Sequence, residues 1–364
     1  MKCMSERKKV LVGMSGGVDS SAAALLLMKQ GYDVCGCTMR LYDNNALGEG
    51  FAESGCCSLS DVDDAKSVCR RIGIEHFTFN FTNDFAKYVM KPFADSYIRG
   101  ETPNPCIECN RHMKFDVMLR RAELLGFDYI ATGHYALTER DGKTGRFILK
   151  RPDDRRKDQT YVLYSLTQHQ LEHTLFPLYG MEKAAVRELA EQNGLVTSHK
   201  PDSQDICFVP DGKYADFIER YTGFKSVRGD FIDEEGNVLG QHSGIINYTV
   251  GQRRGLGIAL GKPVFVTAKD PVNNTVTLSE NVLLKDTLFL RDVNLIALAE
   301  ITSPTAVTAK ARYNAKDTDA VVYPADGNGI YKIVFHKPVS SPALGQACVF
   351  YIDDAVAGGG IICG

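Results

Sequence analysis

The first half of the chain alternates apolar runs with stretches of helical spacing. Apolar runs typical of strands lie at 9–14, 33–39, 75–80 and 128–133. Stretches with helical spacing lie at 19–30, 60–72, 83–99 and 111–125. This alternation is typical of an α/β fold with a Rossmann-like, doubly wound parallel sheet. Ligands of such sheets bind beyond the carboxyl ends of the strands, so we expect Ser15, Met39 and Gly133 to share a site.

The pattern changes near Val209, where helical spacing fades and short β-type runs separated by glycine and asparagine begin. In the last part of the chain these runs lie at 288–296, 306–313, 320–323, 329–336, 346–351 and 360–363. Their spacing indicates a small closed β-barrel. The sequence therefore predicts a catalytic domain at 1–208, a small central domain at 209–280 and a C-terminal β-barrel domain at 281–364.

Composition excludes some classes of protein. Of the 364 residues, 44% are hydrophobic, and no apolar run approaches the roughly 18 residues that a membrane span needs. With a polar start at 1–9, the sequence predicts a cytoplasmic protein without a membrane segment. Eleven cysteines, an odd number that includes Cys56-Cys57, indicate reduced, reactive or metal-binding thiols rather than a disulfide framework. The net charge of −3 by itself gives no sign of a nucleic-acid partner.

A glycine- and serine-rich loop lies between the first predicted strand and the first predicted helix. It comprises Gly13, Met14, Ser15, Gly16, Gly17, Val18, Asp19 and Ser20. The adjacent glycines allow a tight turn close to an anion, and the following helix presents unpaired N–H groups and the positive end of its dipole. No lysine follows the glycines, so the loop is not of the Walker type. Because the carboxylate of Asp19 repels a triphosphate, we expect a magnesium-bridged pyrophosphate here.

Two cysteines lie in segments that favour reactivity over burial. The prolines of 102–105 make a rigid, extended segment that delivers Cys109 at the predicted start of a helix. The field at a helix N-terminus stabilises a thiolate, which favours a nucleophile or a metal ligand. Cys207 follows a polar, acidic stretch and is expected to be exposed and reactive. Cysteines at apolar positions are expected to be buried; they are Cys35, Cys37, Cys69, Cys348 and Cys363.

The loop resembles the pyrophosphate loop of the ATP pyrophosphatases, a class that adenylates substrates with ATP and releases pyrophosphate. Six separated motifs extend the resemblance, so that the chain is similar to the tRNA-specific 2-thiouridylases over nearly its whole length. The motifs lie at 13–20, 102–110, 131–135, 157–159, 205–208 and 251–257. The resemblance implies a nucleotide-hydrolase-like catalytic domain, a small central domain and a β-barrel, in agreement with the pattern above.

The resemblance also implies roles for single residues. ATP would be held by the loop from Gly13 to Ser20 with Met39 and Gly133, and Cys109 would be the nucleophile. Cys207 would carry a persulfide, delivered by a cysteine desulfurase or a sulfur-relay protein. The flipped target base would meet Asn104, Pro105 and Cys106. Further contacts with tRNA are implied for His134, Lys157, Asp158, Gln159, Arg312, Tyr313 and Gln346.

The implied reaction is ATP-dependent 2-thiolation of the wobble uridine of tRNA. Uracil O2 is a poor leaving group, so ATP first adenylates it, and Mg²⁺ stabilises the charge that moves to pyrophosphate. Sulfur from the Cys207 persulfide then replaces the activated oxygen, and a Cys109–Cys207 disulfide remains for a reductant. This route requires the two Cα atoms to come within roughly 7 Å. The target base also has to leave its stack to reach the pocket.

The residues leave several alternatives open. Many members of the family carry aspartate where this chain has Cys106, so acid–base assistance there passes to a thiol, or to Glu108 or Asp205. Together with Cys109 and Cys207, Cys106 makes three thiolates, enough to hold an iron–sulfur cluster that presents sulfur to the adenylated base. Two other hypotheses are a tRNA-binding or sulfur-carrier protein without turnover, and an adenylating synthetase for a small acid or amide.

Two basic stretches are ambiguous on their own. One comprises Lys150, Arg151, Arg155, Arg156 and Lys157. It suits either a contact with RNA or a solvated loop, and only the resemblance favours RNA. The other stretch, Arg253-Arg254 within a glycine-dense run, suits either contact with a phosphate backbone or a plain turn.

Overall fold

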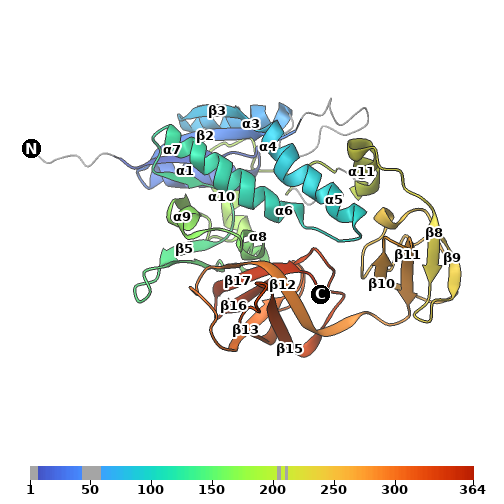
Figure 1. Ribbon diagram of the computed structural model, residues 1–364. Coiled ribbons are helices and arrows are strands. Elements are labelled where there is room, and N and C mark those ends of the chain that lie inside the picture. The colour runs from blue at the N-terminus through green and yellow to red at the C-terminus, as the bar shows by residue number, and fades with distance from the viewer. Residues whose placement is uncertain (1–6, 43–58, 203–205, 210–211) are drawn as a thin grey trace, which may run out of the picture. The chain divides into compact units, whose positions relative to one another are not determined.

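The computed structural model describes residues 7–42, 59–202, 206–209 and 212–364 (Figure 1). The chain divides into two compact units. The first unit comprises 1–89, 106–212 and 354–356, and the second comprises 90–105, 213–353 and 357–364. Cys56, Cys57 and the first residue of the 205–208 motif lie outside the described residues. None of the described helices combines the length and the apolar character that a membrane crossing needs.

A five-stranded sheet lies in the core of the first unit. Its strands are β1 (Lys9–Gly13), β2 (Asp33–Arg40), β3 (Glu75–Asn80), β4 (Tyr129–Ala131) and β7 (Thr174–Leu175). Their order is β3-β2-β1-β4-β7, and neighbouring strands are parallel. The predicted doubly wound α/β sheet is thus confirmed. Strand β7 has no counterpart among the predicted runs, because two residues show no periodicity.

Helices α1 (Val18–Lys29), α3 (Leu59–Ile72) and α10 (Lys183–Gln192) belong to the same unit. The middle of α1 is buried on nearly every side, since it is built of Ala22, Ala23, Ala24 and Leu25. Val186 and Ala190 of α10 join the core that α1 and β1 form. This packing sets the first turn of α10 beside the first turn of α1.

The helix predicted at 83–99 is divided into α4 (Thr82–Phe85), a π-helical turn η1 (Ala86–Met90) and α5 (Lys91–Ile98). Pro92 in the first turn of α5 has no N–H to donate, and the wider π turn accommodates the missing bond. The helix predicted from 111 begins earlier, as α6 (Pro105–Glu108), and continues through π-helical η2 (Cys109–Val117) into α7 (Met118–Leu124). Proline at the first helical position favours this early start, because its N–H is not needed there.

Short elements complete the first unit. A hairpin joins β5 (Leu137–Arg140) to β6 (Phe147–Lys150). It is followed by η3 (Arg155–Lys157), α8 (Thr160–Leu163) and α9 (Gln168–Glu172). A capping box of Thr167 and Gln170 begins α9 and satisfies the free amides of its first turn.

The second unit combines helices, a small sheet and a barrel. Its helix α5 packs against α11 (Tyr214–Thr222) and η5 (Ile245–Asn247). The small sheet has the order β10-β11-β8-β9 and comprises β8 (Gly229–Ile232), β9 (Val238–His242), β10 (Phe265–Asp270) and β11 (Thr275–Ser279). The barrel comprises β12 (Leu284–Leu295), β13 (Thr305–Lys310), β14 (Thr318–Val322), β15 (Tyr331–Ser340), β16 (Ala347–Ile352) and β17 (Ala355–Ile362).

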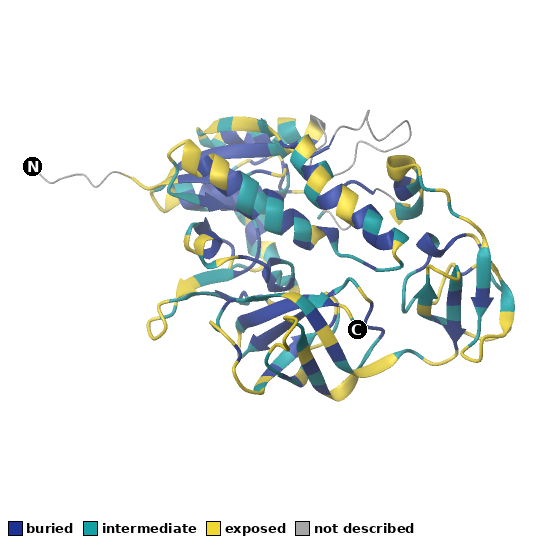
Figure 2. Cartoon of the chain, viewed as in Figure 1, coloured by how far each residue is buried: buried dark blue, intermediate teal, exposed yellow. Residues whose placement is uncertain are grey.

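The barrel closes because β12 pairs antiparallel with both β15 and β17, so no edge remains free between them. Apolar side chains such as Leu288, Ile333 and Phe350 fill its core, and buried residues stand out on its strands and on the parallel sheet (Figure 2). The predicted closed barrel is confirmed. Cys348 is buried in it as predicted, whereas the prediction for Cys363 is wrong: it is exposed, because it follows the end of β17.

Candidate functional site

The strand order of the parallel sheet reverses at β1, whose neighbours β2 and β4 follow it along the chain. Such a reversal opens a crevice at the carboxyl ends of the strands. The loop from Gly13 to Ser20 follows β1, and Gly133 follows β4. A Cβ on Gly133 would lie 2.6 Å from the carbonyl carbon of Asp19 and from the amide of Ser20. The structure therefore brings the 131–135 motif directly onto the first turn of α1.

The loop itself turns sharply at Gly16, which has a φ of +70°. A Cβ there would lie 2.5 Å from the carbonyl oxygen of Asp61 at the start of α3. The amide of Ser15 donates to the Ser20 hydroxyl at 3.2 Å, and that hydroxyl donates to the carbonyl of Gly17 at 3.1 Å. Gly17 is the N-cap of α1 and provides no side-chain cap. The first turn of α1 thus retains the positive character that attracts anions.

The predicted nucleotide-binding residues divide into two groups. The side chains of Met14 and Val18 are buried in the core, with 2% and 3% of their surface exposed, so only their backbones face the loop region. The amide of Met14 already donates to the carbonyl of Cys37 at 2.7 Å. Met39 lies near the carboxyl end of β2 and is half-buried. Contact of these residues with a nucleotide stays a prediction.

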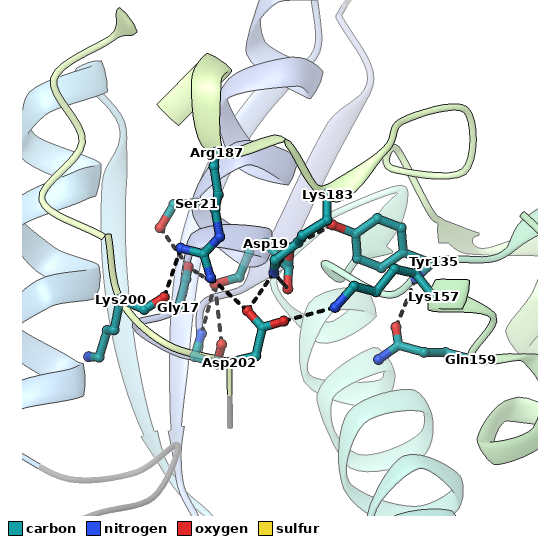
Figure 3. Close-up of polar contacts among 12 residues, drawn as sticks. Gly17, Asp19, Ser21, Tyr135, Lys157, Gln159, Lys183, Arg187, Lys200 and Asp202 are labelled. Carbon is teal, nitrogen blue, oxygen red and sulfur yellow. Dashed lines mark hydrogen bonds and ion pairs between the residues drawn. The ribbon is translucent and has the colours of Figure 1, made fainter. Parts of the chain in front are cut away.

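A network of charged side chains faces the loop (Figure 3). Asp19 accepts hydrogen bonds from the hydroxyl of Tyr135 and from Nζ of Lys183, each at 2.7 Å. Lys183 also lies 2.8 Å from Asp202. Asp202 is further paired with Lys157 at 2.9 Å and with Arg187 at 3.0 Å. Burial acts to raise the pKa of Asp202, but the hydrogen bonds and the charges of Lys183 and Lys157 together outweigh it and lower that pKa to about 2.

Sequence reasoning missed Lys183, Arg187 and Asp202. The first two lie four residues apart on α10 and therefore share one helix face, which is a weak signal on its own. Lys183 and Arg187 both form ion pairs with the carboxylate of Asp202. Arg187 also donates to the carbonyls of Ser198 and Lys200, at 2.8 and 3.0 Å, so α10 supports the stretch that leads to Asp202.

The first reactive cysteine segment begins one turn earlier than predicted. Because helix α6 starts at Pro105, Cys106 lies in its first turn and is exposed. Cys109 lies at the start of η2 and is buried, with 8% of its surface exposed. The expected stabilisation by a helix N-terminus therefore applies to Cys106 more than to Cys109, since that field falls off beyond the first turn. Asn110 anchors η2 by donating to the carbonyl of Val162 in α8 at 3.0 Å.

The second cysteine segment packs on the same helix as the first. The hydroxyl of Tyr42, two residues beyond β2, donates to the carbonyl of Cys207 at 2.6 Å. The ring of Phe208 contacts that of Phe85 in α4, with a centroid distance of 5.5 Å. Helix α4 in turn packs against η2, which starts at Cys109. Both cysteine segments therefore share α4 as a neighbour, and Cys207 is partly exposed.

Several residues expected to contact tRNA are engaged inside the first unit. The side chain of Gln159 accepts from the amide of Tyr135 at 2.9 Å, and Asp158 accepts from Thr160. The ring of His134 is buried between Phe115 and Phe176 and bonds to Thr132 at 2.7 Å. Burial, and then the charge of Lys114, lowers the pKa of His134 well below its usual range. The ring is therefore neutral, and direct contact with RNA requires a rearrangement.

The basic stretch at 150–157 is paired with carboxylates. Lys150 bonds to Glu139, and Arg151 lies 3.4 Å from Asp158. Arg155 and Arg156 pair with Asp354 and Asp154, and Lys157 pairs with Asp202. Because each cation has a partner, this stretch is not an unneutralised basic patch.

In the second unit, two predicted segments meet. The amide of Thr102 donates to the carbonyl of Leu344 at 2.7 Å. Thr102 lies two residues before Asn104, and Leu344 lies two residues before Gln346. Arg312 and Tyr313 are both exposed, and Arg312 donates to the Ser340 hydroxyl at 3.0 Å.

The described residues contain no preformed site for a metal ion or an iron–sulfur cluster. There, His, Cys, Asp and Glu side chains do not gather in groups of three or more that could hold a metal ion. Cys106, Cys109 and Cys207 are all described residues of the first unit.

Comparisons with known proteins identify the family. The models described as "tRNA methyl transferase HUP domain", "tRNA methyl transferase PRC-barrel domain" and "Aminomethyltransferase beta-barrel domain" match residues 8–211, 215–280 and 285–362. The tRNA-specific 2-thiouridylase MnmA of Clostridioides difficile is 49% identical over 99% of both chains. That of Acetivibrio thermocellus is 50% identical over 98% of this chain and 99% of its own. The chain therefore belongs to the tRNA-specific 2-thiouridylase family.

Proposed function

We propose that this protein replaces O2 of the wobble uridine of tRNA with sulfur, using ATP and releasing AMP and pyrophosphate. One observation carries the proposal: the anion-binding loop and both cysteine segments belong to the first unit, at the carboxyl edge of its parallel sheet. The loop follows β1, Tyr42 beyond β2 holds Cys207, and α4 beyond β3 packs against the helix of Cys109. Adenylation and sulfur transfer at one place need this arrangement.

In the first step, O2 of the uracil attacks the α-phosphate of ATP, and the bond to pyrophosphate breaks. The glycine turn and the first turn of α1 bind the phosphates. Asp19 suits a magnesium ion, because its carboxylate lies in that first turn. The ion would offset the repulsion between this carboxylate and the phosphates. Since both oxygens of Asp19 now bond to Lys183, metal binding requires Lys183 to change partners.

In the second step, the terminal sulfur of a Cys207 persulfide attacks C2, and AMP leaves with the former O2. The Cys109 thiolate then attacks the inner sulfur, the persulfide S–S bond breaks, and the sulfur stays on C2. Alternatively, Cys109 attacks first, and the hydrosulfide that it releases attacks C2. Either route leaves a Cys109–Cys207 disulfide, which a two-electron reductant such as a cellular dithiol restores.

The exposure of the two cysteines supports this division of roles. Cys207 is partly exposed, as a residue that receives sulfur from a cysteine desulfurase or a sulfur-relay protein has to be. Cys109 is buried, which keeps bulk water away from the intermediate on which it acts. We place the reaction in the cytoplasm, where thiols are kept reduced.

The test is mass spectrometry of nucleosides from unmodified tRNA treated with ATP, magnesium, a persulfide donor and the protein. We expect 2-thiouridine, with one pyrophosphate released for each. Cys109→Ser and Cys207→Ser should abolish the product, whereas Cys363→Ser, which changes an exposed cysteine at the end of the barrel, should leave it unaltered. Normal thiouridine from either of the first two variants would remove that cysteine from the mechanism.

The alternatives give different results in the same assay. A tRNA-binding or carrier protein without turnover releases no pyrophosphate. A synthetase for a small acid releases pyrophosphate without tRNA. A cluster-dependent thiolase purified without oxygen contains stoichiometric iron and absorbs visible light, and its thiolation stops when the iron is chelated.

A further inference from the structure

The ammonium group of Lys183 lies between two carboxylates. Its Nζ is 2.7 Å from both carboxylate oxygens of Asp19 and 2.8 Å from the carboxylate of Asp202 (Figure 3). Only 14% of the Lys183 side chain is exposed. Since Asp19 belongs to the first turn of α1, Lys183 holds its charge beside the anion-binding loop.

Among the described residues, three cations pair with the carboxylate of Asp202: Lys157, Lys183 and Arg187. Of these three, Lys183 also pairs with Asp19. The positive end of the α1 dipole lies beside it. A partly buried ammonium group beside a glycine turn and a helix N-terminus favours an anion with several charges, such as the phosphates of a nucleotide.

The position of Lys183 is set by the fold. It is the first residue of α10, and Val186 and Ala190 of that helix are wholly buried in the core that α1 shares. A short movement of a flexible lysine side chain is enough to exchange one oxygen partner for another, because its charge sits on a four-carbon stem.

We propose that Lys183 is the phosphate clamp of this site: it neutralises Asp19 before ATP binds, and it transfers its hydrogen bonds to the pyrophosphate part of ATP afterwards. The inference rests on the proposed function, which supplies ATP as the ligand. It assigns to a helix far along the chain the role that a lysine within the loop has in Walker-type proteins. Asp19 is thereby released to face a metal ion at the same moment.

Calorimetric titration with pyrophosphate and, separately, with AMP tests this role, both with magnesium present. We expect Lys183→Met to weaken pyrophosphate binding about 10- to 100-fold, as loss of a charged hydrogen bond does, and to leave AMP binding within about twofold. Lys183→Arg should restore part of the affinity. Lys66→Met is the matched control, because it removes an exposed lysine that pairs with Asp63 on α3.

Unaltered pyrophosphate binding by Lys183→Met, or equal losses for pyrophosphate and AMP, would overturn the clamp. Should Lys183→Met fail to fold, Lys183→Gln keeps hydrogen-bond donors for Asp19 and Asp202 without the charge, and the same criteria apply to it. The outcomes are separable from the proposed function. A wild-type protein that binds pyrophosphate through Lys183 but forms no 2-thiouridine contradicts the proposed function alone.

Discussion

The hydroxyl of Tyr42 donates a hydrogen bond of 2.6 Å to the backbone carbonyl of Cys207, across 165 residues of sequence. Tyr42 lies just beyond the carboxyl end of β2, and its ring lies 6.1 Å from that of Phe85 in α4. Phe208 contacts the same Phe85. The backbone at Cys207 is therefore tied to the sheet edge that also bears the anion-binding loop.

Removing that hydroxyl should slow sulfur transfer. A lost hydrogen bond of about 1 kcal/mol lets Cys207 leave its position, so we expect Tyr42→Phe to lower the rate of thiolation about fivefold. Release of pyrophosphate, measured without a sulfur donor, should change by less than about twofold. Tyr32→Phe removes a hydroxyl from the same unit and should affect neither step. Equal slowing of both steps by Tyr42→Phe would contradict a specific role at Cys207.

The turn at Gly16 should not tolerate a side chain. In Gly16→Ala the new Cβ lies 2.5 Å from the carbonyl oxygen of Asp61, at a φ of +70°. We expect a loss of about 2 to 4 kcal/mol in the free energy of unfolding, as strain and overpacking add, and at least about tenfold weaker pyrophosphate binding. Urea unfolding and calorimetry measure the two effects.

Gly31→Ala separates these causes. Gly31 also has a positive φ, of +91°, but a Cβ there meets nothing within 4 Å. It should cost about 1 to 2 kcal/mol from backbone strain and leave pyrophosphate binding unchanged. Equal effects of the two substitutions on binding would show that close packing on Asp61 does not matter for the loop.

The buried Lys269 should make the free energy of unfolding rise with pH in mild alkali. In the second unit, burial lowers the pKa of Lys269 to about 8, against an opposing effect of Glu101, while its Nζ donates to the carbonyl of Tyr248 at 3.0 Å. The unfolded chain therefore holds more protons than the folded one between pH about 8 and the usual lysine pKa of about 10.4. In that window the contribution of this residue to the free energy of unfolding rises with pH.

Lys269→Met isolates this contribution from those of other groups that titrate in alkali. The free energy of unfolding of the wild type, minus that of Lys269→Met, should increase by about 2 to 3 kcal/mol from pH about 8 to about 10.5. Urea unfolding at a series of pH values measures it. A difference that stays flat, or that falls, would show that Lys269 keeps its ordinary pKa.

Alkylation should distinguish the described cysteines by exposure. Cys106 is exposed and should react first with iodoacetamide. Cys363 is also exposed, but partial burial of its sulfur raises the pKa of its thiol, so it should react later than Cys106. Cys207 is partly exposed and should react faster than the buried cysteines. Burial raises the pKa of Cys35 and of Cys348 to about 12, and that of Cys69 to about 11, so few thiolates form there. Mass spectrometry of labelled peptides gives the order. Fast labelling of Cys348 in the folded protein would mean that the barrel opens readily.

Much of the fold follows from local pattern. The runs at 9–14, 33–39 and 75–80 appear as β1, β2 and β3 with bounds that agree within about one residue. For β1 and β2 the reason is that a strand buried on both faces is nearly all apolar. Strand β3 lies at the sheet edge and is mostly exposed, and its alternating aromatic residues indicate a strand. Predictions failed where a helix was interrupted. The π-helical turn η1 directly precedes the proline in the first turn of α5, and neither η1 nor η2 interrupts the helical spacing of apolar positions in the sequence.

The candidate site was predictable in part. The loop from Gly13 to Ser20 can be recognised in the sequence by its glycines and serines. The cysteine segments can be recognised by the prolines or acidic residues that stand within a few residues of each thiol. Lys183 does not, since nothing around it in sequence distinguishes it from a solvent-exposed lysine at the start of a helix. Its partner Asp19 is 164 residues away, and only the packing of α10 against α1 brings them together.

The sequence by itself determined the parallel sheet, the barrel and the glycine- and serine-rich loop after β1, because each depends on periodicity or on turn and side-chain chemistry among near neighbours. The tertiary structure decided which charges face the loop, which carbonyl Tyr42 holds, and that Cys109 is buried while Cys106 is exposed. Those features depend on how distant segments pack, and packing energy is shared among many contacts that no short stretch of sequence contains.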